Sequence, residues 1–528
     1  MMTITELQQR YAAHPNVEAM SGLLKNPSVR TLFCGGLCAS AASLFSSVLV
    51  QRGEFPFVFI LGDLEEAGYF YHDLTQVLGT DKVLFFPSSF RRAIKYGQKD
   101  AANEILRTEV LSRLQKGEEG LCVVTYPDAL AEKVVSRKEL GDKTLKLHSG
   151  ENVDTNFIME VLRSYGFEYV DYVYEPGQYA VRGSIIDVFS FSSEFPYRID
   201  FFGDEVESIR TFEVETQLSK EKKDSIVIVP DLSRSLEQGG ASGMVSFLDF
   251  LSADTVLAMR DLLWLRERIQ TVHDETLTPQ AIAAREAEES GCITLDGKLI
   301  DGSEFTLRAL DFRRMEFGNK PTGTPDATIT FDTSAQPIFR KNFDMVAESF
   351  KEYMEKGYAL YICSDSMKQT DRIRAIFEDR GDQIAFTAVE RTLHEGFADN
   401  ALRLCIFTDH QLFDRFHKYN LKSDKARSGK VALSLKELNQ FTPGDYVVHT
   451  DHGVGRFSGL VRIPNGDTTQ EVMKLVYQNE DVVFVSIHSL HKVSKYKGKD
   501  GEAPRLNKLG TGAWEKLKER TKTKLSLI

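Results

Sequence analysis

Apolar runs of strand length alternate with helix-length segments through the first part of the chain. Residues 31–34 and 55–61 are apolar enough for buried strands, and residues 40–51 between them have the length and composition of a helix. Gly35 and Gly36 mark a tight turn between the first strand and the helix. This order predicts a strand–helix–strand unit of a nucleotide-binding α/β domain.

Strand-like alternation takes over in two later passages, 179–189 and 197–212. Turn signals at Gly183 and Gly203 separate their runs, which predicts an antiparallel sheet. The side chains of a strand alternate between the two faces of its sheet. The second passage therefore has an expected core face, with Tyr197, Ile199 and Phe201, and an opposite face, with Arg198, Asp200 and Phe202.

The opposite face has two interpretations. An aromatic ring beside arginines, with Arg182 on a neighbouring strand, is typical of the hot spots of protein-binding surfaces. The same pattern fits a solvated face on which Arg198 and Asp200 only balance charge. Pattern alone leaves both interpretations open.

Near the C-terminus, residues 449–457 read His-Thr-Asp-His-Gly-Val-Gly-Arg-Phe and lie among short β-patterned runs such as 446–449 and 482–487. Turn signals punctuate these runs, and they predict a small β-barrel. The glycines within one turn of His452 permit positive φ angles, so the turn can close tightly. A barrel of this kind suits binding better than chemistry.

Length and composition limit the class of protein. A chain of 528 residues is too long for one core, and roughly three to five domains are expected. Hydrophobic residues make up 42% and charged residues 27%, as in ordinary globular proteins. The net charge of −12 argues against a chain that mainly coats a phosphate backbone. Residues 441–500 hold seven Lys or Arg and seven Asp or Glu, so we expect protein partners there rather than nucleic acid.

Cysteine usage and apolar run length indicate the compartment. The six cysteines form no CxxC pair, and four lie inside apolar runs, as expected of reduced, buried thiols. The apolar runs are far too short to span a membrane, and the N-terminus has no signal-peptide pattern. We expect a cytoplasmic protein with no membrane contact.

The glycine turn after the first strand departs from a working phosphate-binding loop. The motif GxxxxGK[ST] needs a lysine for the β- and γ-phosphates and a hydroxyl for magnesium. With Gly35 as its first glycine, the later positions are Ser40, Ala41 and Ala42, so both groups are missing. An unusual working site is one interpretation. We favour the other, a fold that kept its corner but lost the nucleotide, with no catalytic residue.

Four histidines in the barrel region, His449, His452, His488 and His491, suggest a metal site at first sight. Their spacing repeats no common ligand set and no cysteine is nearby. Histidines in strands and turns more often satisfy backbone hydrogen bonds. We expect no metal.

Two sets of motifs carry a family resemblance. Residues 182–189 with 197–210 resemble a passage shared by the excision-repair helicase UvrB and the bacterial transcription-repair coupling factor (Mfd) family. Residues 449–457, with 489–496 and 506–514, resemble the RNA-polymerase-interacting domain of the coupling factors, whose small barrel is shared with CarD-type regulators. UvrB lacks that domain, so the chain is more similar to the coupling factors.

The resemblance implies a multidomain α/β architecture. Its expected parts are a UvrB-like domain 1a with a degenerate P-loop (1–130), an inserted α+β UvrA-binding domain (131–220), a UvrB-like domain 1b (221–340), an α/β domain of unknown role (345–435), an SH3-like RNA-polymerase-interacting β-barrel (440–500) and the start of a linker helix to a translocase (501–528).

The resemblance also implies binding sites, residue by residue. The UvrA-binding surface would include Arg182, Arg198 and Phe202. The polymerase β subunit would add a strand beside Gly459, Leu460, Val461, Arg462 and Ile463. An exposed Ile463 would be the apolar anchor of that contact, and the alternative is a side chain folded back onto the barrel.

The implied function is recruitment of UvrA to stalled RNA polymerase. Full-length family members continue into an ATP- and Mg-dependent translocase, which would supply most DNA contacts and whose motifs are absent here. Residues 1–528 would then need no cofactor and perform no catalysis. Two rivals are an active UvrB-like NTPase or helicase, which the positions after Gly35 oppose, and a CarD-like transcription regulator, which the neutral barrel and acidic chain oppose.

Overall fold

A computed structural model describes residues 2–89, 101–214, 217–232, 243–276, 297–417, 419, 421, 442–465, 468–486, 493–496, 504, 506–509 and 514. For residues 101, 102, 276, 462–465, 468–471, 486 and 495 it describes the backbone only. The chain divides into two units, one of Met1–Thr144 with Asp231–Lys422 and the other of Leu145–Pro230 with Ser423–Ile528.

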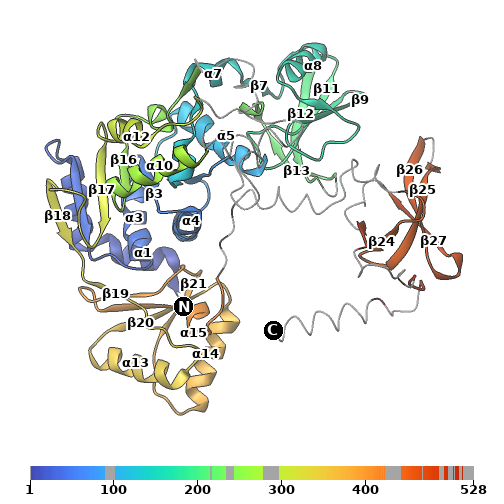
Figure 1. The fold of residues 1–528 in the computed structure, drawn as a ribbon. Helices are drawn as coiled ribbons and strands as arrows, with labels where there is room; N and C mark the ends of the chain where they lie inside the picture. The colour runs from blue at the N-terminus through green and yellow to red at the C-terminus, as the bar shows by residue number, and fades with distance from the viewer. Residues whose placement is uncertain are drawn as a thin grey trace. The chain divides into compact units, whose positions relative to one another are not determined.

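A seven-stranded parallel sheet forms the centre of the first unit (Figure 1). Its order is β18 (Ala327–Thr330), β2 (Thr31–Gly35), β17 (Arg313–Gly318), β16 (Val256–Met259), β3 (Phe57–Ile60), β5 (Cys122–Thr125) and β4 (Val83–Phe86). All its strand pairs are parallel. Every residue of β3, β4, β5 and β16 is buried, because a parallel sheet is covered by helices on both faces.

The helices before α13 in this unit are α1 (Ile4–Ala12), α2 (Pro15–Lys25), α3 (Ala41–Arg52), α4 (Leu64–Leu78), α5 (Ala101–Lys116), α6 (Pro127–Ala131), α7 (Arg137–Asp142), α10 (Leu262–Thr276) and α12 (Gly302–Ala309). Helices α1, α3 and α4 pack on one another, and α10 packs on α6 and α12. Short strands β6 (Val134–Val135) and β15 (Met244–Val245) pair, followed by a 3-10 turn, η2 (Phe247–Phe250).

The strand–helix–strand unit predicted for residues 31–61 is present, with one difference in the order of the strands. Strand β2, helix α3 and strand β3 match the expected strand, helix and strand in one parallel sheet. The two strands are not neighbours, because β17 and β16 lie between them. Those two strands come from residues about 200 to 280 positions later in the sequence, beyond the reach of local pattern.

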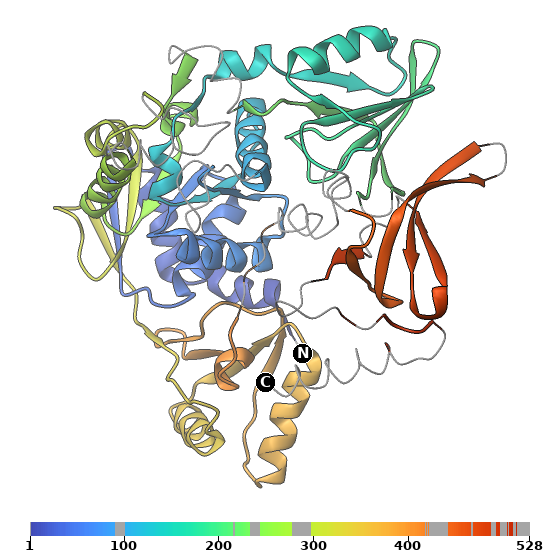
Figure 2. The same cartoon turned by 45° about the vertical axis from the view of Figure 1, so that its right-hand side comes forward.

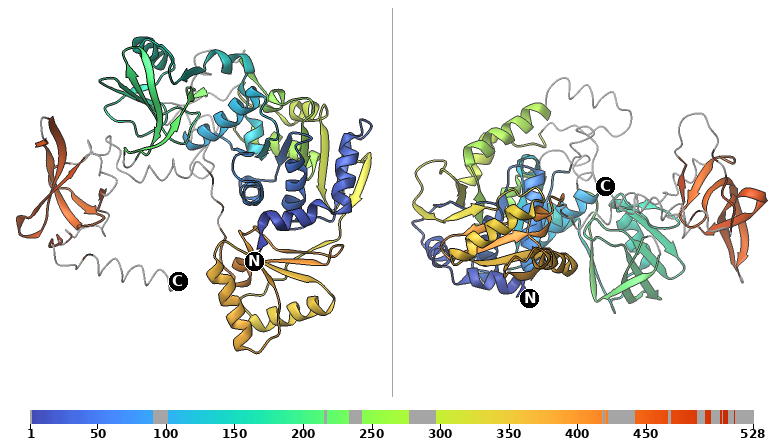
Figure 3. Two further views of the ribbon diagram at one scale, coloured as in Figure 1. Left: turned by 180° about the vertical axis from the view of Figure 1, so that it is seen from behind. Right: turned by 90° about the horizontal axis from the view of Figure 1, so that it is seen from below.

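A second, mixed sheet belongs to the same unit. Its order is β1 (Met2–Thr3), β21 (Thr387–Glu390), β20 (Ala359–Ser364), β23 (Leu404–Thr408), β22 (Phe397–Asp399) and β19 (Thr333–Ala335). Helices α13 (Phe343–Glu355) and α14 (Met367–Asp379) pack against β20, as the yellow and orange helices of Figure 3 show, and α15 (Asp409–Leu412) follows β23. The N-terminal residues complete this sheet, because β1 pairs in parallel with β21.

The insert of the second unit contains a six-stranded sheet with α8 (Thr155–Ser164) lying across it (Figure 3). The strand order is β13 (Ser219–Lys223), β12 (Glu205–Phe212), β11 (Tyr197–Phe202), β10 (Ile185–Val188), β9 (Gln178–Arg182) and β8 (Glu168–Tyr169). Ile158 and Leu162 of α8 share a core with Ile199 and Phe201. This confirms the core face expected from the alternation, with Tyr197 partly buried against the same core.

Strands β7 (Leu145–His148) and β14 (Ser225–Ile228) pair antiparallel at the two ends of the insert. The insert of the structure therefore begins and ends later than the expected range of 131–220.

The last sheet has five antiparallel strands. Its order is β27 (Val482–Ser486), β26 (Thr468–Val476), β25 (Gly453–Asn465), β24 (Tyr446–His449) and β28 (Val493–Lys495), with a 3-10 turn, η4 (Gln478–Glu480), before β27. Val447, Phe457, Met473, Leu475 and Tyr477 lie in its core. The far end of the β25–β26 hairpin extends beyond the other strands, as the orange-red hairpin in Figure 2 shows. The structure confirms a multidomain α/β protein, with the expected strands at 446–449 and from residue 482.

Candidate binding surfaces and the altered nucleotide corner

The corner between β2 and α3 is filled by another part of the chain. Gly36 has a φ of +82°, and a Cβ atom there would lie 2.0 Å from the carbonyl oxygen of Phe331. The hydroxyl of Thr333 donates to the Gly36 carbonyl at 2.6 Å and accepts the N–H of Cys38 at 3.1 Å. Glycine is required at 36 because the backbone of Phe331 lies where a side chain would start. In a phosphate loop this close approach belongs to the nucleotide.

The start of α3 also forms hydrogen bonds with a distant part of the chain. The N–H of Ser40 donates to the carbonyl of Glu395 at 3.4 Å, and the Ser40 hydroxyl accepts the N–H of Glu395 at 2.9 Å. The N–H of Ala41 donates to Cys38. Backbone donors that would face a phosphate in a working loop are therefore used within the protein.

A buried carboxylate lies behind this helix start. Asp73 of α4 accepts the Ser43 hydroxyl at 2.7 Å and the N–H of His394 at 2.6 Å. Burial raises the pKa of Asp73 to about 6, and its hydrogen bonds oppose that rise. A charged Asp73 would repel a phosphate at this corner.

A cavity of about 750 Å³ remains at the carboxyl ends of β2, β3, β16 and β17. In open parallel sheets this is the usual ligand position. Its charged lining is Asp63, Glu65, Glu66, Asp73, Asp261 and Glu395 against Arg260 and Lys320. Arg260 is paired with Glu66, and the excess of carboxylates disfavours a polyphosphate.

Asp187 is the centre of the polar face of the insert sheet. Its side chain is 1% exposed and lies on β10, directly opposite Arg198 of β11. Arg198 donates from Nε to Oδ1 and from Nη2 to Oδ2, both at 2.8 Å. Arg182 of β9 pairs with the same carboxylate from the other side. The strand between the two arginines thus joins them through one buried acid.

Aromatic rings complete this cluster, which we call the Asp187 cluster: Arg182, Asp187 and Arg198 with the rings of Tyr172 and Phe212. The Arg198 guanidinium lies 4.5 Å from the centre of the Phe212 ring, and that of Arg182 lies 4.9 Å from the Tyr172 ring. Arg182 is 34% exposed and Arg198 only 15%. Most of the Arg198 surface is therefore used inside the insert.

Asp200 and Phe202 lie further along β11. Asp200 forms an ion pair with Arg210 of β12 and accepts the Ser208 hydroxyl at 2.9 Å, while the ion pair of Arg198 is with Asp187. Phe202 precedes the turn at Gly203 and is 78% exposed. A large apolar ring at a hairpin tip contributes little to folding and is available for a partner.

Sequence reasoning named the two arginines and the ring but missed Asp187. The available signal was a lone acidic residue inside the apolar run 185–189. An acid in such a run needs a charged partner on an adjacent strand, and the antiparallel register supplies Arg198.

Strand β25 has neighbours on both sides only over its first part. Residues 453–456 pair with β24, and Phe457 donates its N–H to Asp445. From residue 458 to 465, the described residues provide a partner on the β26 side alone. Pro464 fits this arrangement, because proline is tolerated in strands at an unpaired edge.

The predicted contact strand, residues 459–463, falls within this edge. Gly459 has a φ of +117° at an irregularity in the pairing with β26. Leu460 is 38% exposed and Val461 is half-buried. The side chains of Arg462 and Ile463 lie outside the described residues, so the exposure of Ile463 stays a prediction.

The glycines of the turn after β24 make room for large neighbours. A Cβ atom at Gly455 would lie 2.9 Å from the Tyr477 ring. Gly453, at a φ of +78°, faces Asn507 and Trp514 at 2.7 and 2.9 Å. Asn507 accepts the N–H of Val454 at 2.8 Å. Residues 453–455 therefore contact Asn507 and Trp514, which follow the last strand of the sheet in the sequence.

Family models match two parts of the chain. A UvrB interaction domain covers residues 145–233, and a CarD-like/TRCF RID domain covers residues 441–497. A transcription-repair-coupling factor of Bacillus subtilis (strain 168) is 22% identical over 93% of this chain and 47% of its own length. A transcription-repair-coupling factor of Staphylococcus aureus (strain bovine RF122 / ET3-1) is 24% identical over 92% of this chain and 47% of its own length. The chain is related to the transcription-repair-coupling factors.

The chain spans about half the length of the coupling factors it matches. The Asp187 cluster and Phe202 lie in the part that matches the UvrB interaction domain, and the edge of β25 lies in the part that matches the CarD-like/TRCF RID domain. The roles of the individual residues stay predictions.

The motif histidines of this coupling-factor relative have structural contacts. The buried His449 accepts the N–H of Asp451 at 3.1 Å through Nδ1 and stacks on His452, with ring centres 4.6 Å apart. His488 and His491 lie outside the described residues. Within the described ranges no group of three His, Cys, Asp or Glu side chains is placed to hold a metal ion.

The described residues include five of the six cysteines. Cys34, Cys38, Cys122, Cys363 and Cys405 all have free thiols, while Cys292 lies outside the described residues. None of the helices in the described segments has the length and apolar character needed to cross a membrane.

Gly453→Ala is expected to lower the free energy of unfolding of the C-terminal sheet by about 1–3 kcal/mol, because alanine is strained at positive φ and its methyl group would collide with Asn507 and Trp514. Chemical denaturation followed by Trp514 fluorescence, with Trp264→Phe as background, measures the change. Gly459→Ala is the control for a positive φ without a collision, since Gly459 has a φ of +117° and no atom of the described residues lies within 4 Å of an added Cβ. Equal losses for both would contradict a packing role for Gly453.

Proposed function

We propose that this chain recruits UvrA to stalled RNA polymerase. Its C-terminal sheet would bind the polymerase β subunit through the edge of β25, and its insert would bind UvrA through the surface formed by Arg182, Arg198 and Phe202. The observation that carries this proposal is the presence, in one chain, of both matched domains. Each domain also presents a surface suited to protein binding.

The two surfaces use different chemistry. An unpaired strand edge offers main-chain donors and acceptors to a partner strand, and neighbouring side chains add specificity. The insert offers two arginines fixed by Asp187 and, further along β11, the exposed ring of Phe202. Fixed arginines lose little side-chain freedom on binding, which favours affinity.

A bridging experiment tests the recruitment proposal. Immobilised RNA polymerase should retain UvrA only when this chain is added, because the two surfaces belong to separate domains. Retention of the chain without UvrA, or of UvrA without the chain, would contradict the bridge. Each binary pair measured alone provides the control.

We further propose that this chain carries out no catalysis and needs no cofactor. ATP and Mg would serve the translocase half of full-length coupling factors, which would also provide most DNA contacts. The reduced thiols support a cytoplasmic location for this process.

Calorimetric titration with ATP and Mg is expected to show no binding tighter than about 1 mM. The amide donors of the corner are already bonded to Thr333 and Glu395, and the cavity beside them is acidic. The double variant Ala41→Lys, Ala42→Ser restores the missing motif side chains and should still not bind. Micromolar binding by the wild-type chain would favour the UvrB-like NTPase instead.

The third candidate is a CarD-like regulator that contacts promoter DNA, and such contact would need an excess of basic residues. The segment 441–500 has equal numbers of acidic and basic residues. Salt-dependent binding of duplex DNA by this chain would favour that candidate.

A further inference from the structure

Four histidines meet where α4 packs against the chain between residues 392 and 419. His72 lies on α4, His394 lies on the loop after β21, His410 is in α15 and His417 follows α15. The ring centres of His410 and His417 are 4.3 Å apart, and those of His72 and His417 are 4.8 Å apart. The four imidazoles form one group, which we call the histidine cluster.

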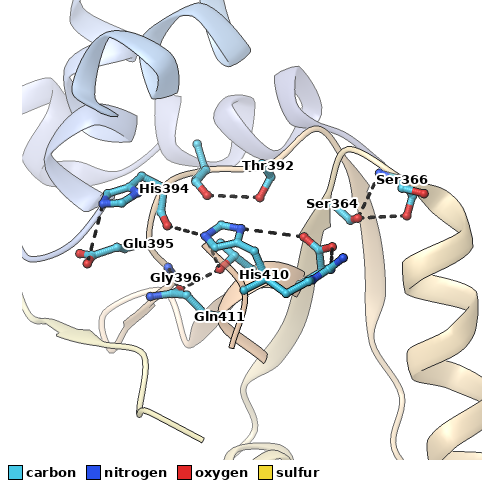
Figure 4. A network of polar contacts seen from close by, with 12 residues as sticks. Ser364, Ser366, Thr392, His394, Glu395, Gly396, His410 and Gln411 are labelled. Carbon is cyan, nitrogen blue, oxygen red and sulfur yellow. Dashed lines mark hydrogen bonds and ion pairs between the residues drawn. The ribbon is translucent and has the colours of Figure 1, made fainter. Parts of the chain in front are cut away.

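The ring nitrogens of this cluster have few partners. His410 donates through Nε2 to the carbonyl of His394 at 2.8 Å, as Figure 4 shows. One buried nitrogen on each ring has no hydrogen-bond partner among the described residues: Nε2 of His72, Nδ1 of His394, Nδ1 of His410 and Nε2 of His417. A proton added to such a nitrogen creates a buried charge without a hydrogen-bond acceptor.

The same segment is fastened to α4 by aromatic contacts. Tyr69 stacks on His394 with ring centres 3.5 Å apart and donates its hydroxyl proton to the His417 carbonyl at 2.7 Å. The ring of Tyr419 lies against Gly68, where a Cβ atom would approach it to 2.4 Å. The next residue after His394 is Glu395, whose N–H donates to the Ser40 hydroxyl at the corner between β2 and α3. Movement of this segment would therefore also open the corner.

Charged and titratable groups face the cluster from each element around it. Helix α4 contributes Glu65, Tyr69 and Asp73, and the loop 392–396 contributes Glu395. Asp409 lies in α15 and Arg415 follows this helix, while Asp365 follows β20. The shortest approach of a carboxylate to a cluster ring nitrogen is 3.9 Å, from Asp409 to Nδ1 of His410. The nearby acids are thus not hydrogen-bonded to the rings.

We propose that the histidine cluster is a proton-sensitive clamp: neutral imidazoles hold residues 392–417 and Tyr419 on α4, and their protonation releases this segment from α4 and from the corner between β2 and α3. The clamp does not depend on the proposed recruitment function.

The direction of the pH effect follows from the pKa values. Burial lowers the pKa of His72 and His394 to about 4 and that of His410 to about 3, and it also lowers the pKa of His417. The released segment would regain ordinary values near 6.5, so release takes up protons as the pH falls from about 6.5 towards 4. Asp73 and Asp409 act in the opposite direction, because burial raises their pKa in the clamped state.

At pH 5 release adds about one proton at each of His72, His394 and His410 and removes about one proton from Asp73, so the net uptake is about two protons. The shifts of His417 and Asp409 act in opposite directions. The equilibrium constant for release should then rise about 100-fold for each pH unit in this range. Above about pH 8 it should become nearly independent of pH, because the released imidazoles then bind few protons and the clamped ones bind none.

Hydrogen exchange of the full chain at pH 7, 6 and 5, corrected for intrinsic exchange rates, tests the clamp. Protection of peptides from residues 64–78, 391–396 and 409–417, which lie outside the paired strands β22 and β23, should fall about 100-fold between pH 6 and pH 5. Peptides from β3, β16 and the insert sheet should keep their protection. Unchanged protection of the clamp peptides would overturn the proposal, and so would an equal loss in all peptides, which indicates global unfolding.

Variants test the proton count. His410→Gln should reduce the dependence to about tenfold per pH unit, because it removes one group that gains a proton on release. His417→Gln should also reduce the dependence, because burial lowers the pKa of His417 in the clamped state. His273→Gln, on α10, is the matched control and should leave the 100-fold dependence unchanged. If either cluster variant fails to fold, exchange of the histidine C2 hydrogens in the wild-type chain reports the same titrations. Four cluster histidines titrating near 6.5 would overturn the proposal.

Discussion

Ile463→Arg is expected to abolish capture of the RNA polymerase β subunit and to raise its Kd at least about 100-fold. Position 463 lies in the part of β25 that has a described partner only on the β26 side. A partner strand added there would bury neighbouring side chains, and an arginine would place an unpaired charge in that dry contact. Surface plasmon resonance with immobilised β subunit measures the effect.

Ile463→Val is the matched control, because it keeps an apolar β-branched side chain and should change the Kd less than about fivefold. Hydrogen exchange in β24 to β27 should be the same in both variants and the wild type. Polymerase binding that survives Ile463→Arg would reject this edge as the contact strand and favour a side chain folded back onto the sheet.

Arg198→Glu is expected to eliminate UvrA binding while leaving polymerase binding intact. The new carboxylate would face Asp187, which is 1% exposed and would lose its bidentate partner. Loss of one member of a buried ion pair costs about 3–5 kcal/mol, so the insert itself should also become less stable. Pull-down of UvrA and of polymerase from purified mixtures separates the two activities.

Phe202→Ala separates binding from folding at the same surface. Phe202 is 78% exposed, so its removal should leave thermal stability unchanged while weakening UvrA binding at least about tenfold. Leu218→Ala, another exposed apolar residue of the insert at 68%, is the control for a general loss of apolar surface. If Phe202→Ala binds UvrA normally, Phe202 is not part of the UvrA contact.

The sequence was most informative where the structure depends on local pattern. Alternation in 197–202 placed Ile199 and Phe201 in the core correctly, because a strand covered on one face must alternate. The missing lysine and hydroxyl after Gly35 were visible in the same way. Both depend only on residues a few positions apart.

Features that depend on distant residues could not be predicted from pattern. The contact of Phe331 with Gly36 and the bond from Glu395 to Ser40 join segments about 300 residues apart, and no periodicity links them. The histidine cluster was missed for the same reason. Its members are spread from 72 to 417, and each is an ordinary residue in its own neighbourhood.

The antiparallel pair of β7 and β14 determines how the insert is joined to the rest of the chain. Leu145 lies directly opposite Ile228, so the path leaves the first unit and returns to it through adjacent backbones about 5 Å apart. A turn of a few residues could join the two points if the insert were removed. The insert, with its candidate binding surface, can therefore be gained, lost or exchanged in evolution as one unit without repacking either sheet of the first unit.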